Sequence, residues 1–174
     1  AYVKVQDGCF LPCSYCIIPQ VRPEVWSRPV AEIADEVRRL ADAGYREVVL
    51  TGVHLGLFGH DRPREERVDL AGLVERLIGV RDGFRIRLSS LEVNEVSERL
   101  LAVMAAHPDR VCPHLHIPLQ SGSPSVLRRM RRRASKGYFF DRCERVQELL
   151  PLPALSTDAM VGFPGETEED FEAT

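Results

Sequence analysis

Three cysteines lie within eight positions near the start of the sequence: Cys9, Cys13 and Cys16. Thiolates are the usual protein ligands of iron–sulfur clusters, and a 4Fe–4S cubane contains four irons. Three thiolates on one tight loop can hold three of those irons and leave the fourth open to a substrate or cofactor. A fourth cysteine would close the site and make it an electron carrier. The triplet therefore predicts a 4Fe–4S cluster with one open coordination site.

Zinc binding and disulfide formation are the alternative uses of these cysteines. A structural zinc site has four ligands, typically from two CxxC or HxxxH pairs, and this sequence has no second pair. Cys112 with His114 or His116 could supply a fourth ligand, so zinc stays an alternative. Five cysteines is an odd number, which argues against a disulfide framework. Cys143 lies on an apolar helical face, which is typical of core packing.

Strand-like and helix-like segments alternate along the chain and must position the cysteine loop. Short alternating or β-branched runs predict strands at 2–5, 47–50, 85–91, 114–119 and 154–161. Helical spacing of apolar residues predicts helices at 30–41, 70–78, 96–104 and 123–150, and a capping box at 167–170 opens a last helix. Strands that each lead into a helix predict a parallel sheet with right-handed crossovers. We expect an α/β partial (β/α) barrel that stops before a sixth strand.

Polar residues and glycines follow directly after the predicted strands. In a β/α barrel these positions share one face, where active sites collect. The candidates are Tyr15 in the cysteine loop, Thr51 and Gly52, Ser90 and Glu92, Gln120 and Ser121, and Asp158 and Gly162. Asp158 falls inside a predicted strand. Because a lone buried carboxylate is costly, we expect Asp158 to be functional or paired.

The composition is that of an ordinary globular domain. The 174 residues include 44% hydrophobic and 28% charged side chains, with a net charge of −3. This length is enough for one well-buried domain and short for two. No apolar stretch reaches the roughly 18 residues that cross a bilayer, and nothing at the N-terminus resembles a signal peptide. We expect a cytoplasmic protein with reduced cysteines and no membrane partner.

The cysteine spacing resembles the CxxxCx(aromatic)C motif of the radical S-adenosylmethionine (SAM) superfamily, with Tyr15 as the aromatic residue. By that resemblance, SAM chelates the open iron through the amino and carboxylate groups of its methionine part. An electron from the cluster then cleaves SAM to methionine and a 5′-deoxyadenosyl radical, so a reducing electron donor is an implied partner. The motif indicates the superfamily but does not identify the reaction.

Seven stretches, in family order and over nearly the whole chain, look like the methylthiotransferases. They are Gly8-Cys9, Cys16 to Pro19, Ser27 to Pro29, Leu50 to His54, Arg87 to Glu92, His114 to Ser123 and Val161 to Thr167. Thr51 to His54, with Phe58-Gly59 after it, is most similar to the tRNA threonylcarbamoyladenosine methylthiotransferases. Those enzymes add a methylthio group to a modified adenosine beside the tRNA anticodon, which implies a tRNA substrate. A ribosomal-protein or isopentenyladenosine methylthiotransferase, and a metal-stabilised binding module without SAM turnover, stay alternatives.

The same resemblance implies SAM contacts for the residues at the strand ends. Thr51 and Gly52 would place backbone groups near the SAM amino group, Ser90 and Glu92 would bond the ribose hydroxyls, and Gln120 and Ser121 would contact SAM. Gly162 would allow close approach of adenine, and Tyr15 and Asp158 complete the expected set. The alternatives are structural: a strand-end turn, a helix cap, a satisfied loop backbone or a tight turn.

The sequence departs from the family in one loop and lacks two of its domains. Pro23 and Trp26 replace the glycine and the middle arginine of the family's Arg-Gly-x-x-Arg-Ser-Arg segment. Because proline fixes φ where glycine is free, we expect a different loop path. The family also has an N-terminal domain with an auxiliary cluster on three more cysteines, and a C-terminal RNA-binding domain. We therefore expect 1–174 to be a radical SAM core fragment, with a second 4Fe–4S cluster only in the full-length protein.

A basic segment runs from Arg128 to Arg145, where eight basic side chains stand against two acidic ones. Neutralising phosphates dominates the affinity of proteins for nucleic acids. This predicted helix is therefore a candidate contact for tRNA. A solvated helix face is the alternative.

Overall fold

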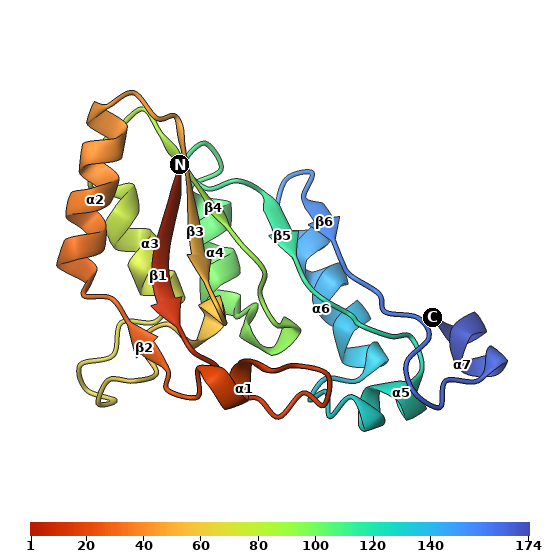
Figure 1. Ribbon diagram of the computed structural model, residues 1–174. Coiled ribbons are helices and arrows are strands. Elements are labelled where there is room, and N and C mark those ends of the chain that lie inside the picture. The colour runs from red at the N-terminus through yellow and green to blue at the C-terminus, as the bar shows by residue number, and fades with distance from the viewer.

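Five parallel strands of the chain stand in the order in which they occur in the sequence. The computed structural model describes residues 1–174, and these strands are β1 (Tyr2–Asp7), β3 (Glu47–Gly52), β4 (Arg85–Leu88), β5 (His114–His116) and β6 (Ala154–Ser156). β1 pairs in parallel with β3, β3 with β4, and β5 with β6. A parallel bridge between Ile86 and Val111 joins the two groups. The result is an open sheet with β1 and β6 on opposite sides (Figure 1).

Helices connect the strands and cover one face of the sheet. They are α1 (Ile18–Val21), α2 (Val30–Asp42), α3 (Leu70–Ile78), α4 (Glu98–Ala106), α5 (Pro124–Arg129), α6 (Lys136–Leu149) and α7 (Glu168–Ala173). Two short 3₁₀ helices, η1 (Leu55–Leu57) and η2 (Val93–Glu95), follow β3 and β4. α3, α4 and α6 lie behind the strands in Figure 1, and α2 stands beside β1. No helix combines the length with the hydrophobicity that a bilayer crossing requires.

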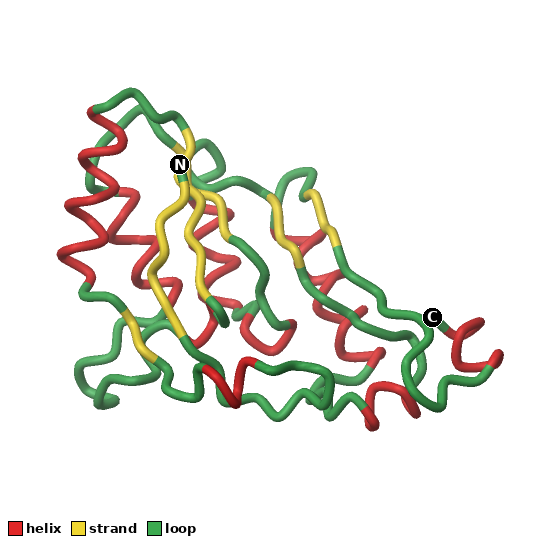
Figure 2. Tube along the Cα trace, in the orientation of Figure 1, coloured by secondary structure: helices red, strands yellow, loops and turns green.

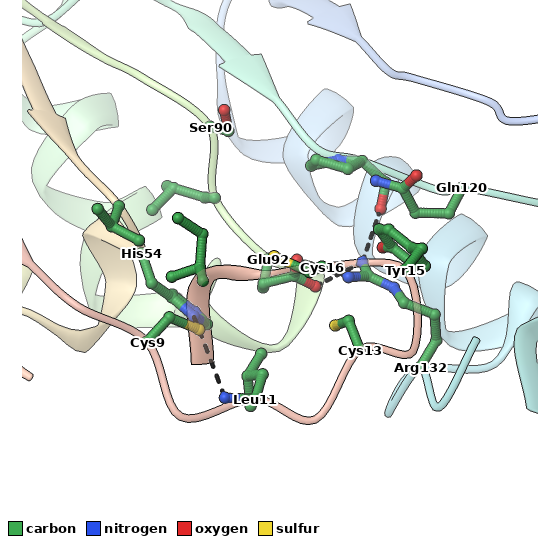
Figure 3. A pocket seen from close by; sticks show the side chains of 14 residues that line it. Cys9, Leu11, Cys13, Tyr15, Cys16, His54, Ser90, Glu92, Gln120 and Arg132 are labelled. Atoms are coloured by element: carbon green, nitrogen blue, oxygen red, sulfur yellow. Dashed lines mark hydrogen bonds and ion pairs between the residues drawn. The ribbon is translucent and has the colours of Figure 1, made fainter. Parts of the chain in front are cut away.

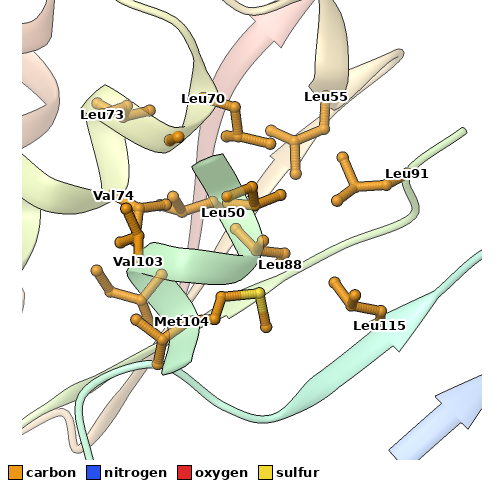
Figure 4. Close-up of a cluster of buried hydrophobic side chains, with 14 of the residues drawn as sticks. Leu50, Leu55, Leu70, Leu73, Val74, Leu88, Leu91, Val103, Met104 and Leu115 are labelled. Atoms are coloured by element: carbon orange, nitrogen blue, oxygen red, sulfur yellow. The ribbon is translucent and has the colours of Figure 1, made fainter. Parts of the chain in front are cut away.

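The strands bury one face and leave the other polar. Successive side chains of a strand point to opposite faces, so alternate positions pack against the helices. The buried set is Val3, Val5, Val48, Leu50, Ile86, Leu88 and Leu115, each at most 1% exposed. Figure 4 shows Leu50 and Leu88 packed with Leu73, Val74 and Met104 from the helices. The intervening positions point to the other face of the sheet, the inner face of the partial barrel. They include charged residues such as Lys4, Glu47 and Arg87.

Most predicted elements are confirmed, and two differ. All five predicted parallel strands are present, and α2 and α3 match the helices predicted at 30–41 and 70–78. The single helix predicted at 123–150 is wrong, because the chain turns between α5 and α6 (Figure 2) and Arg131 adopts a φ of 57° there. The antiparallel strand β2 (Trp26–Ser27) was not predicted, since two residues are too few to show a period. The predicted capping box at Thr167 is confirmed.

Glu47 ties the amino ends of two strands together on the inner face. Its carboxylate accepts hydrogen bonds from Nε of Arg87 at 2.8 Å and from Nε of Arg85 at 2.7 Å. The bond from Arg87, assisted by Arg85, outweighs burial and lowers the pKa of Glu47 from 4.5 to about 2. A carboxyl with a depressed folded-state pKa stabilises the fold above its unfolded-state pKa. That contribution is lost as the pH falls through the folded-state pKa.

We expect Glu47→Gln to lower the free energy of unfolding at pH 7. The difference from the wild type should shrink as the pH falls from about 4.5 towards 2, the two pKa values of this carboxyl. Urea unfolding at a series of pH values measures both effects. Iron binding should be unchanged, since the amino ends of barrel strands serve stability rather than catalysis. A stability difference that does not change with pH would contradict the role of this carboxylate.

Candidate functional site

One pocket opens at the carboxyl ends of the parallel strands. It holds about 600 Å³ of space, part of it open to solvent. Its lining comes from the loop after β1 with the start of α1, from the segments after β3, β4 and β5, and from the turn after α5. The residues are Cys9, Leu11, Cys13, Tyr15, Cys16, Ile18, Val53, His54, Ser90, Leu91, Glu92, Pro118, Gln120 and Arg132. Figure 3 shows these side chains around the pocket. The fold thus brings the three cysteines together with four predicted SAM contacts, Tyr15, Ser90, Glu92 and Gln120.

The start of the cysteine loop is pressed against the segment that precedes β2. Gly8 has a φ of 79°, and a β-carbon there would stand 1.8 Å from the carbonyl oxygen of Glu24, so glycine is required. The N–H of Cys9 donates to the carbonyl of Arg22 at 3.1 Å. Pro23 lies between these two contacts. The segment with the unusual proline is therefore part of the support of the loop.

The middle of the cysteine loop is held by the end of α5. The N–H of Ser14 donates to the carbonyl of Met130 at 3.2 Å, and its hydroxyl donates to the carbonyl of Arg129 at 2.8 Å. The last carbonyls of a helix have no partner inside the helix, so they are available as acceptors. A segment more than a hundred residues away thus holds the cysteine loop in place.

The three thiols suit the ligand set of an iron–sulfur cluster. All three are free, partly buried and in contact with the same pocket. A zinc site requires its ligands close together, with sulfurs about 2.3 Å from the ion. No three His, Cys, Asp or Glu side chains lie close enough together to hold a single metal ion in this way. Cys112 cannot be the fourth zinc ligand, because it lies at the opposite end of the strands, with its Sγ 3.4 Å from Oε2 of Glu47. The residues present fit a 4Fe–4S cluster with three thiolate ligands.

His54 stands between Cys9 and Glu95 in the pocket wall. Its Nδ1 lies 3.2 Å from Sγ of Cys9, and its Nε2 lies 2.5 Å from Oε1 of Glu95. Burial lowers the pKa of His54, but the hydrogen bonds to Cys9 and Glu95 outweigh it and raise the pKa to about 9. Burial likewise raises the pKa of the Cys9 thiol, but the contacts with His54 and the N–H of Leu11 outweigh it and lower that pKa. Cys9 is therefore disposed towards the thiolate that binds iron.

Arg132 is a pocket residue that the sequence did not single out. Its side chain is only 6% exposed and donates to both carboxylate oxygens of Glu92, at 2.7 and 2.5 Å, and to the carbonyl of Pro118 at 3.1 Å. The sequence placed it among the candidate phosphate contacts, and for Arg132 this is wrong, because the guanidinium faces the pocket. Burial, partly offset by Arg132, raises the pKa of Tyr15 to about 12, so the phenol keeps its proton.

Thr51 and Gly52 border the pocket without lining it. They end β3, and the next residue, Val53, is part of the lining. A β-carbon at Gly52 would stand 2.8 Å from Oε1 of the buried Gln6, so glycine lets these two segments approach. A SAM contact through the backbone of Thr51 and Gly52 stays a prediction.

Three of the predicted site residues, Ser121, Asp158 and Gly162, lie outside this pocket. Ser121 is fully buried, and its hydroxyl is 3.0 Å from Oγ1 of Thr174. Gly162 is exposed in a turn, with a φ of 73°. Asp158 follows β6 rather than lying inside it, and its side chain is 70% exposed, so the expectation of a buried carboxylate is wrong. Asp158 is nevertheless paired, with Nε2 of His116 at 3.2 Å.

Proteins of similar sequence share one domain with this chain. The radical SAM superfamily matches residues 3–174. The threonylcarbamoyladenosine tRNA methylthiotransferase MtaB of Bacillus subtilis is 42% identical over the whole chain, which covers 38% of that protein. The tRNA-2-methylthio-N(6)-dimethylallyladenosine synthase of Desulfitobacterium hafniense is 38% identical over the whole chain, again with 38% of the relative covered. The chain thus spans about two fifths of the length of these curated relatives.

Solved structures show the same fold at lower sequence identity. The radical SAM methyltransferase TsrM of Kitasatospora setae, solved with cobalamin and a [4Fe-4S] cluster, is 19% identical with a TM-score of 0.78 over 99% of this chain and 33% of that one. Methylornithine synthase (PylB) is 15% identical with a TM-score of 0.64 over 99% of this chain and 47% of that one. These likenesses confirm the partial (β/α) barrel expected from the sequence. With the cysteine motif and the match over residues 3–174, they place the chain in the radical SAM superfamily.

Proposed function

We propose that this chain is the radical SAM core of a tRNA methylthiotransferase that adds a methylthio group to N6-threonylcarbamoyladenosine beside the anticodon. The observation that carries the proposal is the 42% identity, over the whole chain, with a relative of that activity. The cysteine pocket supports the chemistry. The dimethylallyladenosine-modifying relative, at 38% identity, makes an isopentenyl-type adenosine the second candidate substrate.

In this proposal, some pocket residues bind the cluster and others bind SAM. Cys9, Cys13 and Cys16 would hold the cluster, which supplies the electron for reductive cleavage of SAM when it is bound. Tyr15, Ser90 and Gln120 would contact SAM, because they line the space beside the thiols. Glu92 would contact the ribose from a position fixed by both of its hydrogen bonds to Arg132. These charge-assisted bonds leave the carboxylate little freedom, which favours one orientation of the ligand.

We propose that the full-length protein contains further domains. The relatives are much longer than the chain, and by the family resemblance the additional length would include an N-terminal domain with an auxiliary 4Fe–4S cluster and a C-terminal RNA-binding domain. A reducing electron donor would be the second partner besides tRNA. With a tRNA substrate, we propose that the reaction takes place in the cytoplasm.

Incubation with defined substrates tests the proposal. The reconstituted complete protein, supplied with methyl-labelled SAM, should label tRNA that carries threonylcarbamoyladenosine. A Cys13→Ala variant should not. Mass spectrometry of the digested tRNA identifies the labelled nucleoside. Label only in dimethylallyladenosine tRNA would favour the second candidate, and label only in ribosomal protein would overturn an RNA substrate.

Three exposed arginines at the end of α5 remain candidates for phosphate contact: Arg128, Arg131 and Arg133. The other arginines of the basic segment are paired, namely Arg129 with Asp170, Arg132 with Glu92, and Arg142 and Arg145 with Glu98. We expect the triple replacement of the three exposed arginines by glutamine to weaken tRNA binding. The log–log salt slope should fall by about one unit for each phosphate that the variant no longer neutralises.

A matched control removes the same charge from the helices on the far side of the chain. Arg38, Arg39 and Arg76 are exposed on α2 and α3, away from the cysteine loop. Their replacement by glutamine should leave the slope close to that of the wild type. Filter binding or anisotropy over a range of salt concentrations gives the slopes. Equal slopes in the two triple variants would show that the basic segment is a solvated helix face and makes no contact with tRNA phosphates.

A further inference from the structure

A chain of hydrogen bonds leads from Cys9 into the protein interior through His54. Sγ of Cys9 is 3.2 Å from Nδ1 of His54, whose Nε2 is 2.5 Å from Oε1 of Glu95. The three residues come from the loop after β1, the segment after β3 and η2 after β4. Figure 3 shows the ring of His54 directly against the sulfur of Cys9. The arrangement thus spans three crossovers of the barrel.

The backbone of His54 is fixed to the cysteine loop by one buried side chain. Gln6 is fully buried, and its Oε1 accepts from the N–H of His54 at 2.8 Å. Its Nε2 donates to the carbonyls of Asp7 and Gly8, each at 2.7 Å. Gln6 therefore ties the backbone just before Cys9 to the backbone of His54. This link restrains the position of His54 relative to the cysteine loop.

The side of the His54 ring that faces away from Cys9 is held by Glu95. The side chain of His54 is 5% exposed and that of Glu95 is 19% exposed. A β-carbon at Gly56 would stand 2.1 Å from Oε2 of Glu95, so the absence of a side chain there admits the carboxylate. Oε2 is buried without a hydrogen-bond partner, which leaves His54 as the group that Glu95 binds. Glu95 is thus built in to hold the ring.

The side chains of Cys9 and Glu95 determine how the ring of His54 forms hydrogen bonds. A thiolate only accepts hydrogen bonds, so Nδ1 of His54 is the donor in its contact with Sγ of Cys9. Glu95 holds the ring from its other nitrogen, as carboxylates commonly do for histidines at metal sites. A hydrogen bond to a ligand sulfur stabilises the reduced cluster, which carries one more negative charge, and such bonds help to set cluster potentials. We propose that His54 is a positioning residue that donates to the Cys9 ligand and raises the reduction potential of the cluster.

This inference rests on the cluster proposed above, and the midpoint potential of the reconstituted holoprotein tests it. His54→Leu should disfavour one-electron reduction by about tenfold, which corresponds to about 59 mV. His54→Asn, which keeps an N–H near the position of Nδ1, should restore part of that shift. His60→Leu is the matched control, because His60 is exposed and outside the pocket. Spectroelectrochemical titration gives the midpoints, and iron and sulfide assays show that the variants carry the same cluster.

The outcomes separate this inference from the proposed cluster. A wild type without iron would overturn both. A loaded His54→Leu variant with the midpoint of the wild type would overturn the role of His54 alone. If His54→Leu takes up no iron, Glu95→Gln decides. An amide holds the ring of His54 less firmly than a carboxylate does, so this variant should shift the midpoint in the same direction. An unchanged midpoint in Glu95→Gln would then overturn the inference.

Discussion

Replacement of Cys9, Cys13 or Cys16 by alanine is expected to abolish cluster binding. The anaerobically reconstituted wild type should bind about four irons and four sulfides, as a cubane requires. Each of the three variants removes one of the thiolates that face the pocket, and no neighbouring thiol replaces it, because Cys112 and Cys143 lie elsewhere. Iron and sulfide assays with the absorbance spectrum measure the loss.

Cys143→Ala is the matched control for these variants. Cys143 packs against the hydrophobic core from α6, so its replacement should leave the iron content unchanged. The far-ultraviolet circular dichroism of all four variants should match that of the wild type. Tight stoichiometric zinc, with no iron absorbance after reconstitution, would contradict the cluster.

The reduced, reconstituted chain is expected to cleave SAM slowly to 5′-deoxyadenosine and to place no methylthio group on tRNA. The pocket holds the thiols and four predicted SAM contacts, so we expect cleavage to occur there. The chain has only two further cysteines, Cys112 before β5 and Cys143 on α6, so it lacks the three cysteines expected for the auxiliary cluster. The pocket is partly open to solvent, and small misplacement of reacting groups lowers a rate by about a hundredfold. Chromatography of the nucleoside product and mass spectrometry of digested tRNA measure the two activities.

Two results would contradict this separation of activities. A methylthiolated adenosine made by the chain alone, with sulfide supplied, would show that the auxiliary cluster is dispensable. Absence of 5′-deoxyadenosine with both cluster and SAM bound would instead favour a binding module. The Cys13→Ala variant, incubated in parallel, gives the background level of SAM breakdown.

The proposed ligand loop and the individual strands could be predicted from the sequence because both depend on local patterns. Three cysteines within eight positions must share one loop, whatever the rest of the chain does. Alternating or β-branched runs mark the strands, and these patterns were enough to predict the five parallel strands that the structure contains. The prediction failed where the local signal was weak. β2 has only two residues, and the turn at Arg131 follows helix-forming residues with no glycine or proline to mark it.

The burial and the partners of the charged and polar side chains depend on the tertiary structure. Arg132 belongs to a basic run in the sequence, yet it is buried because Glu92, forty positions earlier, faces it across the pocket. Asp158 was expected to be buried, yet it is exposed because β6 has a neighbouring strand on one side only. His54 reaches Cys9 and Glu95 because β1, β3 and β4 end at the same edge of the sheet. Burial of a charge depends on a partner, and the partner comes from a distant segment that only the folded chain brings near.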